Sequence, residues 1–485
     1  MFVMKTSLTS AALLLLFAPL LAFSQTSVIV SEREPTVVYD PSELNPIDPR
    51  YEYEGPTLLQ DIRVIDGTGA EPVEGQDVLV VDGKIAATGP TGSLEAPGDA
   101  RVIDGDGLTV LPGLIDVHGH FYGGWRGGND SGIKPTYVKW QLLTYLYAGV
   151  THVHDIGTPF PDVAADVRDQ IAAGAIMGPD ATMSGQFFET APVGAAGESM
   201  LFVNPSADAV GGWLDKQKHT FGVEMVKCHA GTSPQILKLV VSEALERDMR
   251  VVCDLWHLNG SPWIADMTGL HGYAHNSFMS IEPSPEDAAR LAELGTFITS
   301  TTVMYDTFGA YRVQTEGDYI SGNSLIEDVQ PPAWIEAARS RGGEESSARY
   351  QSIFEGIMGT DNDTQRNWVF KWNKMLIDAG VLLGVGTDAP YTNNWTGESM
   401  HREMELWVNE SGISPIQTIK GATHNNARIL KIEDRTGSIA VGLEGDLLVV
   451  EGNPAENISD SRNIRYVFNN GKIVDRESLT RQWKH

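Results

Sequence analysis

The sequence predicts an α/β protein, a (β/α)8 TIM barrel with a small β-sandwich domain built from both chain ends. Three observations carry this prediction. Apolar strand-like runs alternate with amphipathic helical stretches over residues 113–430, which is typical of a parallel barrel. Short alternating segments with Gly, Asp and Pro at their ends occur before and after that region, as in antiparallel strands. The segments "DGKI" at Asp82 and "NGKI" at Asn470 resemble each other, which indicates that the two ends share one domain.

The predicted organisation follows from these patterns. Residues 1–24 read as a signal peptide, because Lys5 precedes a short apolar run that ends among small residues. Residues 25–55 are rich in Pro, Glu and Asp and predict an extended N-terminal arm. Residues 56–112 and 431–485 form the predicted β-sandwich domain. We therefore expect a periplasmic or secreted protein without stable membrane insertion after signal cleavage, since no later segment is long and apolar enough to span a bilayer.

The charge of the chain argues against nucleic acid and anionic membranes as binding partners. The 485 residues carry 64 acidic and 35 basic side chains, a formal net charge of −29. Such a surface repels nucleic acid phosphates and anionic lipids. We therefore expect a small-molecule partner rather than nucleic acid. The two cysteines, Cys228 and Cys253, each lie within a predicted strand, and we expect their side chains to point in opposed directions and to remain unbridged.

Eight runs read as the barrel strands. In order they are "LIDVH", "THVHD", "DATMSG", "VEMVKCH", "MRVVCDLWH", "GYAHN", "GTFITSTT" and "VLLGVGTDAP". The first ends in His118 and His120, whose side chains share one face because side chains repeat every two residues. Active sites of such barrels lie where the strands end. Two imidazoles aimed at one point suit a divalent metal, although two hydrogen-bonded loop histidines explain this pair equally well.

Four further strand ends favour the metal interpretation. They offer Lys227, His257, His275 and Asp388. A lone buried ammonium such as that of Lys227 is costly and needs a partner or a modification. Each residue alone has a structural explanation; for example, Asp388 could cap a helix. Five strand ends that all offer a ligand or a charge have no single structural explanation.

These residues resemble the amidohydrolase superfamily of metal-dependent hydrolases, and its imidazolonepropionase-like and Xaa-Pro dipeptidase-like branch in particular. The matching stretches are "VLPGLIDVHGH", "AGVTHVHDIGT", "VGTDAP", "HREMELWVNESGISPIQTIKGATHNNARIL" and "GSIAVGLEGDLLVVEGNP". The resemblance runs from about Leu58 to Asp475. It is highly specific for the superfamily and weak for the substrate. Many members form oligomers, so a homo-oligomer is compatible with it.

The resemblance implies two divalent metal ions, most often zinc. His118, His120 and Asp388 would hold one ion, and His257 and His275 the other. Lys227 would be N-carboxylated and bridge them. A metal-bound hydroxide would then attack a carbonyl, with Asp388 as the proton shuttle.

The fifth strand departs from the family pattern and leaves two readings open. Counting from the strand start puts Asp254 at the ligand position, whereas counting back from "GLHGYAHN" favours His257. We favour His257 as the ligand; Asp254 at this position would change the second metal site or abolish it. His152 and His154 lie in the second strand, where this family rarely places ligands, and we interpret them as structural.

The predicted function is an exported amidohydrolase that cleaves a C–N bond of an amide, dipeptide or cyclic amide. Alternatives are lactone or ester hydrolysis and deamination of a heterocycle on the same site. Deaminases of this superfamily usually lack the fourth-strand lysine and carry a glutamate after the fifth-strand histidine, and "HLNGSP" offers none. A third alternative is a non-catalytic periplasmic binding protein. Retention of Asp388 argues against it, because a pure binder needs no proton shuttle.

Overall fold

The structure is a computed structural model. It describes residues 28–29, 47–121, 135–190, 200–229, 232–254, 262–276, 282–308, 311–340, 362–390 and 393–480. The predicted signal peptide and His257 lie outside these residues, as does most of the predicted N-terminal arm. Among the described helices, none is both long and apolar enough to cross a membrane.

The strands predicted for the barrel form two sheets with parallel pairing. The first contains β8 (Leu114–Gly119), β9 (Val150–Asp155) and β10 (Asp180–Met183). The second runs through β13 (Met225–Cys228), β14 (Arg250–Cys253), β15 (Gly272–Ala274), β16 (Phe297–Ser300) and β17 (Leu382–Val385). Its far edge adds β11 (Phe188–Glu189), β12 (Met200–Phe202) and β1 (Val28–Ile29). All eight predicted strands are therefore present in chain order.

Backbone hydrogen bonds connect the two sheets just beyond the ends of β8 and β17. The amides of Thr387 and Asp388 donate to the carbonyl oxygen of His118 at 3.2 and 2.6 Å, and the His120 amide donates to Ala389 O at 3.0 Å. The carboxylate of Asp116 in β8 braces the same junction, accepting bonds from the Thr387 amide and hydroxyl at 3.2 and 2.6 Å. The first and last strands thus lie side by side at the ends where the site residues project.

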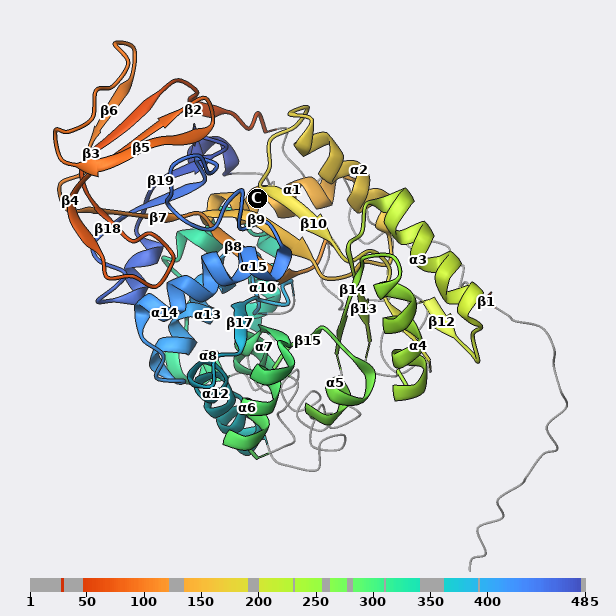
Figure 1. The fold of residues 1–485 in the computed structure, drawn as a ribbon. Coiled ribbons are helices and arrows are strands. Elements are labelled where there is room, and N and C mark those ends of the chain that lie inside the picture. Colours follow the sequence, from red (N-terminus) through yellow and green to blue (C-terminus); the bar gives the residue numbers. More distant parts are fainter. Residues whose placement is uncertain are drawn as a thin grey trace, which may run out of the picture.

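Helices lie on the outside of the strands. Figure 1 shows α2, α3 and α4 on the outer side of β10, β13 and β14. The helices that connect or follow the strands are α1 (Pro135–Tyr147), α2 (Pro161–Ala172), α3 (Ala207–Phe221), α4 (Pro234–Leu245), α5 (Pro262–Thr268), α6 (Pro285–Leu294), α12 (Asn362–Asp378), α13 (Glu398–Asn409), α14 (Pro415–Lys420) and α15 (Asn426–Leu430). A π-helical turn, η3 (Gly421–Asn425), joins the last two. One large apolar core packs the inner faces of these helices against the strands.

Ser-Pro pairs explain where three of these helices begin. Ser233, Ser284 and Ser414 precede α4, α6 and α14, and each serine side chain accepts a hydrogen bond from a first-turn amide. The proline that follows each serine occupies the first helical position, where its missing amide hydrogen costs nothing and its φ angle is already helical. The sequence signal and the observed start coincide at all three.

The long segment between β16 and β17 contains helices of its own. They are α7 (Thr302–Phe308), α8 (Tyr311–Glu316), α9 (Ser324–Glu327) and α10 (Pro332–Ser340). A buried ion pair anchors this segment, because Arg312 in α8 holds the fully buried Glu398 of α13 with two bonds of 2.9 and 2.7 Å. Arg462, in the short helix η4 (Ile458–Arg462), bonds to Glu398 at 2.8 Å from the C-terminal side. Three distant parts of the chain therefore meet at one carboxylate.

Both chain ends build one nine-stranded sheet beside these layers, as the sequence predicts (Figure 1). Its N-terminal strands are β2 (Tyr51–Tyr53), β3 (Thr57–Val64), β4 (Val73–Val81), β5 (Lys84–Pro90), β6 (Arg101–Asp104) and β7 (Leu108–Pro112). Its C-terminal strands are β18 (Leu447–Glu451), β19 (Ile464–Asn469) and β20 (Lys472–Val474), and a 3-10 turn, η5 (Arg476–Leu479), follows. β18 pairs with β7 and β2 pairs with β20. A separate apolar core draws residues from both ends.

The repeated "DGKI" and "NGKI" segments are the turns of two hairpins in this sheet. Asp82 and Asn470 have φ angles of 49° and 52°, and the glycines after them, Gly83 and Gly471, have 79° and 75°. Two consecutive positive φ values define the hairpin turn that favours Asp-Gly and Asn-Gly. The turns also touch, since a Cβ on Gly471 would lie 2.5 Å from the Cα of Gly83. The sequence echo thus marks two turns in contact.

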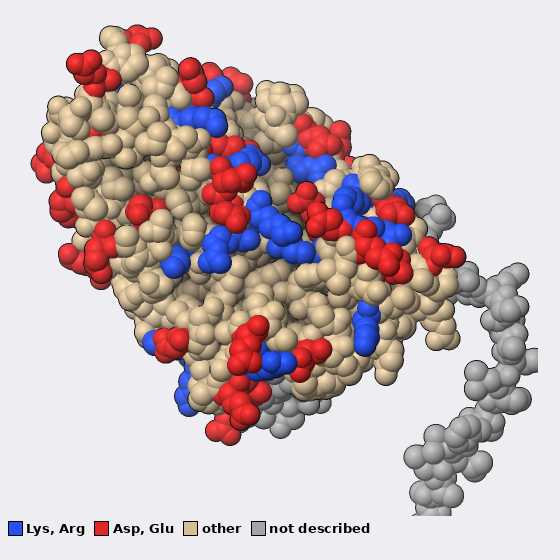
Figure 2. Space-filling view, viewed as in Figure 1, with Lys and Arg blue, Asp and Glu red and all other residues tan. Residues whose placement is uncertain are grey.

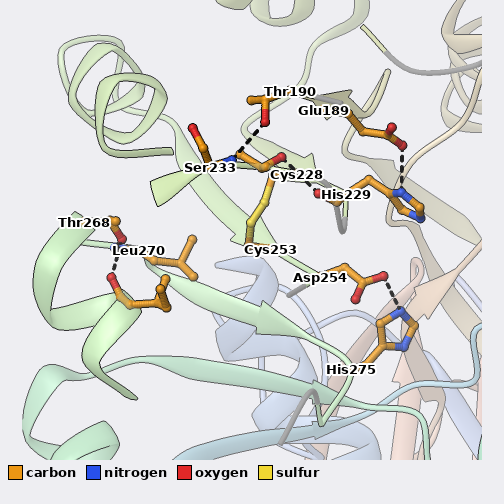
Figure 3. Close-up of a disulfide and its surroundings, with 12 residues drawn as sticks. Glu189, Thr190, Cys228, His229, Ser233, Cys253, Asp254, Thr268, Leu270 and His275 are labelled. Carbon is orange, nitrogen blue, oxygen red and sulfur yellow. Dashed lines mark hydrogen bonds and ion pairs between the residues drawn. A yellow bond between two sulfur atoms is a disulfide. The ribbon is translucent and has the colours of Figure 1, made fainter. Parts of the chain in front are cut away.

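The expectation of unbridged cysteines is wrong. Cys228 and Cys253 form a disulfide between β13 and β14, with Cα atoms 4.6 Å apart (Figure 3). The two strands are parallel neighbours, and their register pairs Cys228 directly with Cys253. Both side chains therefore point to the same side, away from the site. The expectation of opposed directions was made without the register of the two strands, which places the cysteines directly beside each other.

Candidate metal centre

His118 and His120 lie at the end of β8, buried and held by different partners. Nδ1 of His118 lies 2.8 Å from the Thr299 hydroxyl, which leaves Nε2 facing the other site residues. Nδ1 of His120 lies 2.8 Å from the carbonyl oxygen of Gly157. A carbonyl oxygen only accepts, so this nitrogen carries the hydrogen of the neutral ring. In that tautomer, Nε2 of His120 presents a lone pair.

That lone pair faces a carboxylate. Nε2 of His120 lies 2.8 Å from Oδ1 of Asp388, and the same oxygen lies 3.4 Å from Nε2 of His118. Burial alone would raise the pKa of Asp388, but the neighbouring His275, His118 and His120 outweigh it and hold the pKa well below the usual range. Two acceptor atoms this close repel each other unless a cation lies between them. The arrangement therefore calls for a proton or a metal ion at this point.

His275 completes a buried set of three ligand atoms. Its Nδ1 lies 2.8 Å from the Thr301 hydroxyl, which orients the ring. One donor atom each from His118, His275 and Asp388 lies within 4.8 Å of the others, and all three residues are buried. Two nitrogens and one carboxylate oxygen are a donor set that zinc and similar ions accept. These residues fit a divalent metal.

His275 and Asp388 share an unusual backbone conformation, with φ angles of 64° and 57°. Residues other than glycine rarely adopt this left-handed region, and such residues concentrate at functional sites. His275 directly follows β15 and Asp388 lies three residues beyond the end of β17. The turn aims each side chain inward at the strand end, and the Asp388 amide is tied to His118 O.

Lys227 projects from β13 into the same space. Its side chain is 2% exposed, and Nζ lies 3.4 Å from Nε2 of His118. The ammonium also lies 5.3 Å from the centre of the Phe187 ring. Burial, His275 and Lys227 together hold the pKa of His118 well below its usual value, so that imidazole is neutral and able to donate a lone pair. The structure thus brings together five of the six predicted ligands.

For the fifth strand, the structure places Asp254 in the site. β14 ends at Cys253, and the Asp254 amide continues its ladder with a 3.1 Å bond to Cys228 O. Figure 3 shows the Asp254 carboxylate turned toward His275, and the separation from Oδ2 to Nε2 is 3.3 Å. Burial would raise the pKa of Asp254, but His275, Lys227 and His229 lower it overall. His257, the ligand chosen from the sequence, lies outside the described residues.

Sequence reasoning missed two acidic residues at the site. Glu189, at the end of β11, lies 2.7 Å from Nδ1 of His229 (Figure 3). Asp116 accepts a 3.0 Å bond from the His118 amide, and burial raises the pKa of Asp116 to about 6. Asp116 was visible inside "LIDVH", where a carboxylate between apolar residues needs a partner. Glu189 carried no such signal, because it lies in a two-residue strand.

His152 and His154 are also buried, but they lie among hydroxyl groups. Nδ1 of His154 lies 2.9 Å from the Thr182 hydroxyl and Nε2 lies 2.9 Å from that of Ser184. Nε2 of His152 lies 3.2 Å from the same threonine. The register pairs His152 with Ile115, three residues before His118. These contacts are those of hydrogen-bonded interior histidines.

Comparison with known proteins supplies the family. The amidohydrolase family model matches residues 109–474. Among curated relatives, enamidase of Eubacterium barkeri is 33% identical over 141 residues, which is 28% of this chain and 33% of that protein. Imidazolonepropionase of Herpetosiphon aurantiacus is 22% identical over 412 residues, 82% of this chain and 87% of that protein. The matched stretch thus spans only about a third of enamidase.

A solved structure shows the same fold. The putative prolidase from Bifidobacterium longum superposes with a TM-score of 0.67 at 21% identity, covering 87% of this chain and 95% of that one. The fold is therefore a TIM-barrel-type α/β fold. The chain belongs to the amidohydrolase family, a class of metal-dependent hydrolases acting on carbon–nitrogen bonds. The resemblance to its imidazolonepropionase-like and Xaa-Pro dipeptidase-like branch is confirmed.

Proposed function

We propose that the protein is an exported metal-dependent amidohydrolase that cleaves the C–N bond of an amide, a dipeptide or a cyclic amide. The observation that carries the proposal is the approach of Nε2 of His120 to Oδ1 of Asp388 at 2.8 Å, beside the buried donor set of His118, His275 and Asp388. The Gly157 carbonyl accepts the hydrogen bond from Nδ1 of His120, so Nε2 is left to meet Asp388 through a metal ion or a proton, and we propose the metal ion.

The proposed ligands divide into two groups. His118, His120 and Asp388 would hold one divalent ion, most often zinc in such sites. His275 would hold the second, with Asp254 as the fifth-strand partner because its carboxylate already lies beside His275. In this arrangement His257 is not required. Lys227, carboxylated on Nζ, would become an anion and bridge the two groups, which also removes the cost of a buried ammonium.

Bound divalent ions would supply Lewis acidity, which activates water near neutral pH and polarises the scissile carbonyl. The protein's own residues handle the proton and the orientation. Asp388 is ionised and buried, so it can accept a proton from the nucleophile and deliver it to the leaving nitrogen. Thr299 and Thr301 hold the rings of His118 and His275 in place through their Nδ1 atoms.

Export is part of the proposal. Residues 1–24 would direct the chain out of the cytoplasm, and the mature protein would act in the periplasm or be secreted. The Cys228–Cys253 disulfide supports this, since disulfides persist in oxidising compartments. The partner would be a small-molecule substrate, and a homo-oligomer is compatible with the resemblance.

The finer architecture is likewise proposed. The bonds from Thr387 and Asp388 to His118 support a closed eight-stranded barrel over residues 113–430. The nine-stranded sheet and its separate core support a β-sandwich of residues 56–112 and 431–485.

The test is a substrate screen on purified mature protein, with dipeptides, N-acyl amino acids and cyclic amides as candidates. We expect hydrolysis of at least one amide, abolished by a chelator and restored by Zn²⁺, Mn²⁺ or Co²⁺. Lactones, phosphoesters and aminated heterocycles serve as comparison substrates. Turnover of those alone would replace the amide proposal with the corresponding hydrolase or deaminase. Ligand binding without any turnover would favour a binding protein.

A further inference from the structure

Tyr305 lies just beyond the end of β16, in the middle of α7. β16 ends at Ser300 and α7 begins at Thr302. The residue between them, Thr301, orients the ring of His275, because its hydroxyl lies 2.8 Å from Nδ1 of that ring. The strand end that carries Tyr305 is therefore the one that positions a proposed metal ligand.

The first turn of α7 is held from two sides. The buried carboxylate of Glu403 in α13 accepts a 2.5 Å bond from the Val303 amide. From α12, the buried amide of Asn373 donates a 2.8 Å bond to the Thr302 hydroxyl. A side chain on a turn that is locked by such bonds keeps a defined direction. Tyr305 thus has a fixed place relative to the strand ends.

The phenol of Tyr305 lies near two carboxylates of the metal centre. Burial raises the pKa of Tyr305 well above its usual value, and Asp254 and then Asp388 raise it further. Glu403, which lies on the helix side, contributes least of the three carboxylates. Asp254 follows β14 and Asp388 lies beyond β17, so they flank β16 from opposite directions in the sheet. A phenol close to both lies over the strand ends, on the side of the metal centre.

The Tyr305 hydroxyl is a buried donor without a partner. The residue is 6% exposed, and its hydroxyl oxygen makes no hydrogen bond to any described residue. Lys227 and Asp388 are each 2% exposed, so the phenol is enclosed in the same way as the proposed ligands. An unpaired buried hydroxyl is costly, and a catalytic role is one reason for a native fold to retain it.

The chemistry proposed for the site supplies a partner for this hydroxyl. Hydrolysis of an amide places negative charge on the carbonyl oxygen while the carbon becomes tetrahedral. A donor that is already in place stabilises this charge more than it stabilises the neutral carbonyl of the substrate. The carboxylates of Asp254 and Asp388 only accept hydrogen bonds, whereas a phenol donates one. Tyr305 therefore offers what these two neighbours lack.

We propose that the Tyr305 hydroxyl donates a hydrogen bond to the carbonyl oxygen of the substrate as that oxygen becomes an oxyanion. Tyr305 keeps its proton throughout and forms no covalent bond. This role rests on the proposed amide hydrolysis, because it requires a carbonyl substrate at the strand ends. It makes Tyr305 a catalytic residue in addition to Asp388.

Steady-state kinetics of Tyr305→Phe with the amide found in the substrate screen tests this role. We expect kcat to fall by about 10²–10³-fold, as on loss of one oxyanion donor, with KM within about threefold of wild type. Metal content should stay unchanged. The midpoint of thermal unfolding should not fall, since the variant removes a buried hydroxyl that has no partner to lose. A kcat near wild type, or a loss of activity together with bound metal or thermal stability, would overturn the role.

Tyr273→Phe is the matched control. Tyr273 is also fully buried, but its hydroxyl accepts a 3.2 Å bond from the Ala265 amide in α5. This variant should lower the midpoint of thermal unfolding, because a buried amide loses its partner, and should keep kcat near wild type. A loss of kcat in Tyr273→Phe as large as that in Tyr305→Phe would show that neither loss reports on an oxyanion contact.

Binding of methylphosphonate separates this role from the proposed function. Isothermal titration calorimetry on Zn²⁺-loaded protein requires no turnover, and the tetrahedral oxygens of the phosphonate resemble those of the oxyanion. We expect Tyr305→Phe to raise the dissociation constant about tenfold and Tyr273→Phe to leave it unchanged. If the screen finds no amide substrate, weaker binding in Tyr305→Phe still supports the hydrogen bond to a bound anion, while amide hydrolysis is lost as the function. Equal affinity in wild type and Tyr305→Phe, or no saturable binding to wild type, would overturn the role of Tyr305 whatever the screen finds.

Surface cations do not confuse this comparison. On the face drawn in Figure 2, Lys and Arg lie close to Asp and Glu, and Arg435, for example, bonds to Asp180 and Glu444 at 2.8 and 2.9 Å. Neither tyrosine variant changes a surface charge. Weak binding of the anion to the surface would therefore add equally to wild type and to both variants.

Discussion

Two His-x-His segments occupy neighbouring parallel strands, and their surroundings differ. His118 and His120 lie at the end of β8, against a carboxylate, an ammonium and a third histidine. His152 and His154 lie in β9, and their side chains hydrogen-bond to the hydroxyl groups of Thr182 and Ser184. The spacing is the same, so spacing alone does not make a metal ligand. His154 even occupies the same place in β9 as His118 does in β8, one residue before the last. What distinguishes the two segments is the set of groups around them: a carboxylate, an ammonium and a third histidine on one side, and hydroxyl groups on the other.

The largest expected effect is a difference in catalytic activity between a variant at the metal centre and a variant in the His152–His154 segment. Asp388→Asn should lower kcat/KM for the substrate found in the screen by about 10²–10⁴-fold, because the amide cannot accept the proton. His154→Gln should leave kcat/KM within about threefold of wild type, since His154 is assigned no proton transfer. Steady-state kinetics on both variants measures this. Equal losses in the two variants would break the comparison.

Removing the disulfide tests how much the bond between β13 and β14 stabilises the strands that carry site residues. Cys228→Ser with Cys253→Ser should lower the free energy of unfolding by about 2–4 kcal/mol. The bond joins β13 and β14, which position Lys227 and Asp254, yet neither sulfur faces the site. Urea unfolding measures the loss, and a thiol titration of denatured wild type should find no free cysteine. Two free thiols in the exported protein would contradict the bridge.

The buried carboxylate of Asp446, directly before β18, makes the stability of the fold depend on pH. Burial, reinforced by Asp180, raises the pKa of Asp446 from 3.8 to about 8. Between these values the folded chain binds more protons than the unfolded chain, so stability falls as the pH rises through that window. The stability of Asp446→Asn relative to wild type should therefore rise by about 4 kcal/mol between about pH 5 and pH 8. Urea unfolding at both pH values measures this, and an equal difference at the two would refute the assignment.

The smallest effect concerns the hydroxyl-bonded segment. His154→Leu removes two hydrogen bonds and should cost about 1 kcal/mol for each. Metal content should stay at the wild-type value, because His154 bonds to Thr182 and Ser184 rather than to a site residue. Thermal unfolding and elemental analysis on the same sample measure both. A loss of metal in His154→Leu would show that His154 contributes to the metal centre, and the proposed difference between the two His-x-His segments would be wrong.

The site residues at the strand ends were predictable because all parallel strands of a barrel end at the same face. His118, His120, Lys227, His275 and Asp388 each follow or end an apolar run, and parallel strands carry such residues to one face. The sequence also predicted that the two chain ends share one domain, since Asp82-Gly83 and Asn470-Gly471 form turns of the same type.

Register and side-chain direction were not predictable in the same way. The bridge between Cys228 and Cys253 depends on which residues of adjacent strands pair, and a shift of one residue reverses every face. The same uncertainty separated Asp254 from His257, because the answer depends on where β14 ends. Glu189 meets His229 only through tertiary packing, because Glu189 ends β11 whereas His229 follows β13, and the two residues lie far apart in the sequence.

The central claim is a divalent metal centre built by the strand-end residues. The most direct test is metal content per chain, by elemental mass spectrometry, for wild type and for His118→Ala, Asp254→Ala, His257→Ala and His152→Ala. We predict about two ions in wild type, fewer in His118→Ala and Asp254→Ala, and no change in His257→Ala or His152→Ala. Wild type without bound metal after reconstitution, or a loss confined to His152→Ala, would contradict the assignment of the centre. A loss in His257→Ala but not in Asp254→Ala would return the fifth-strand ligand to His257.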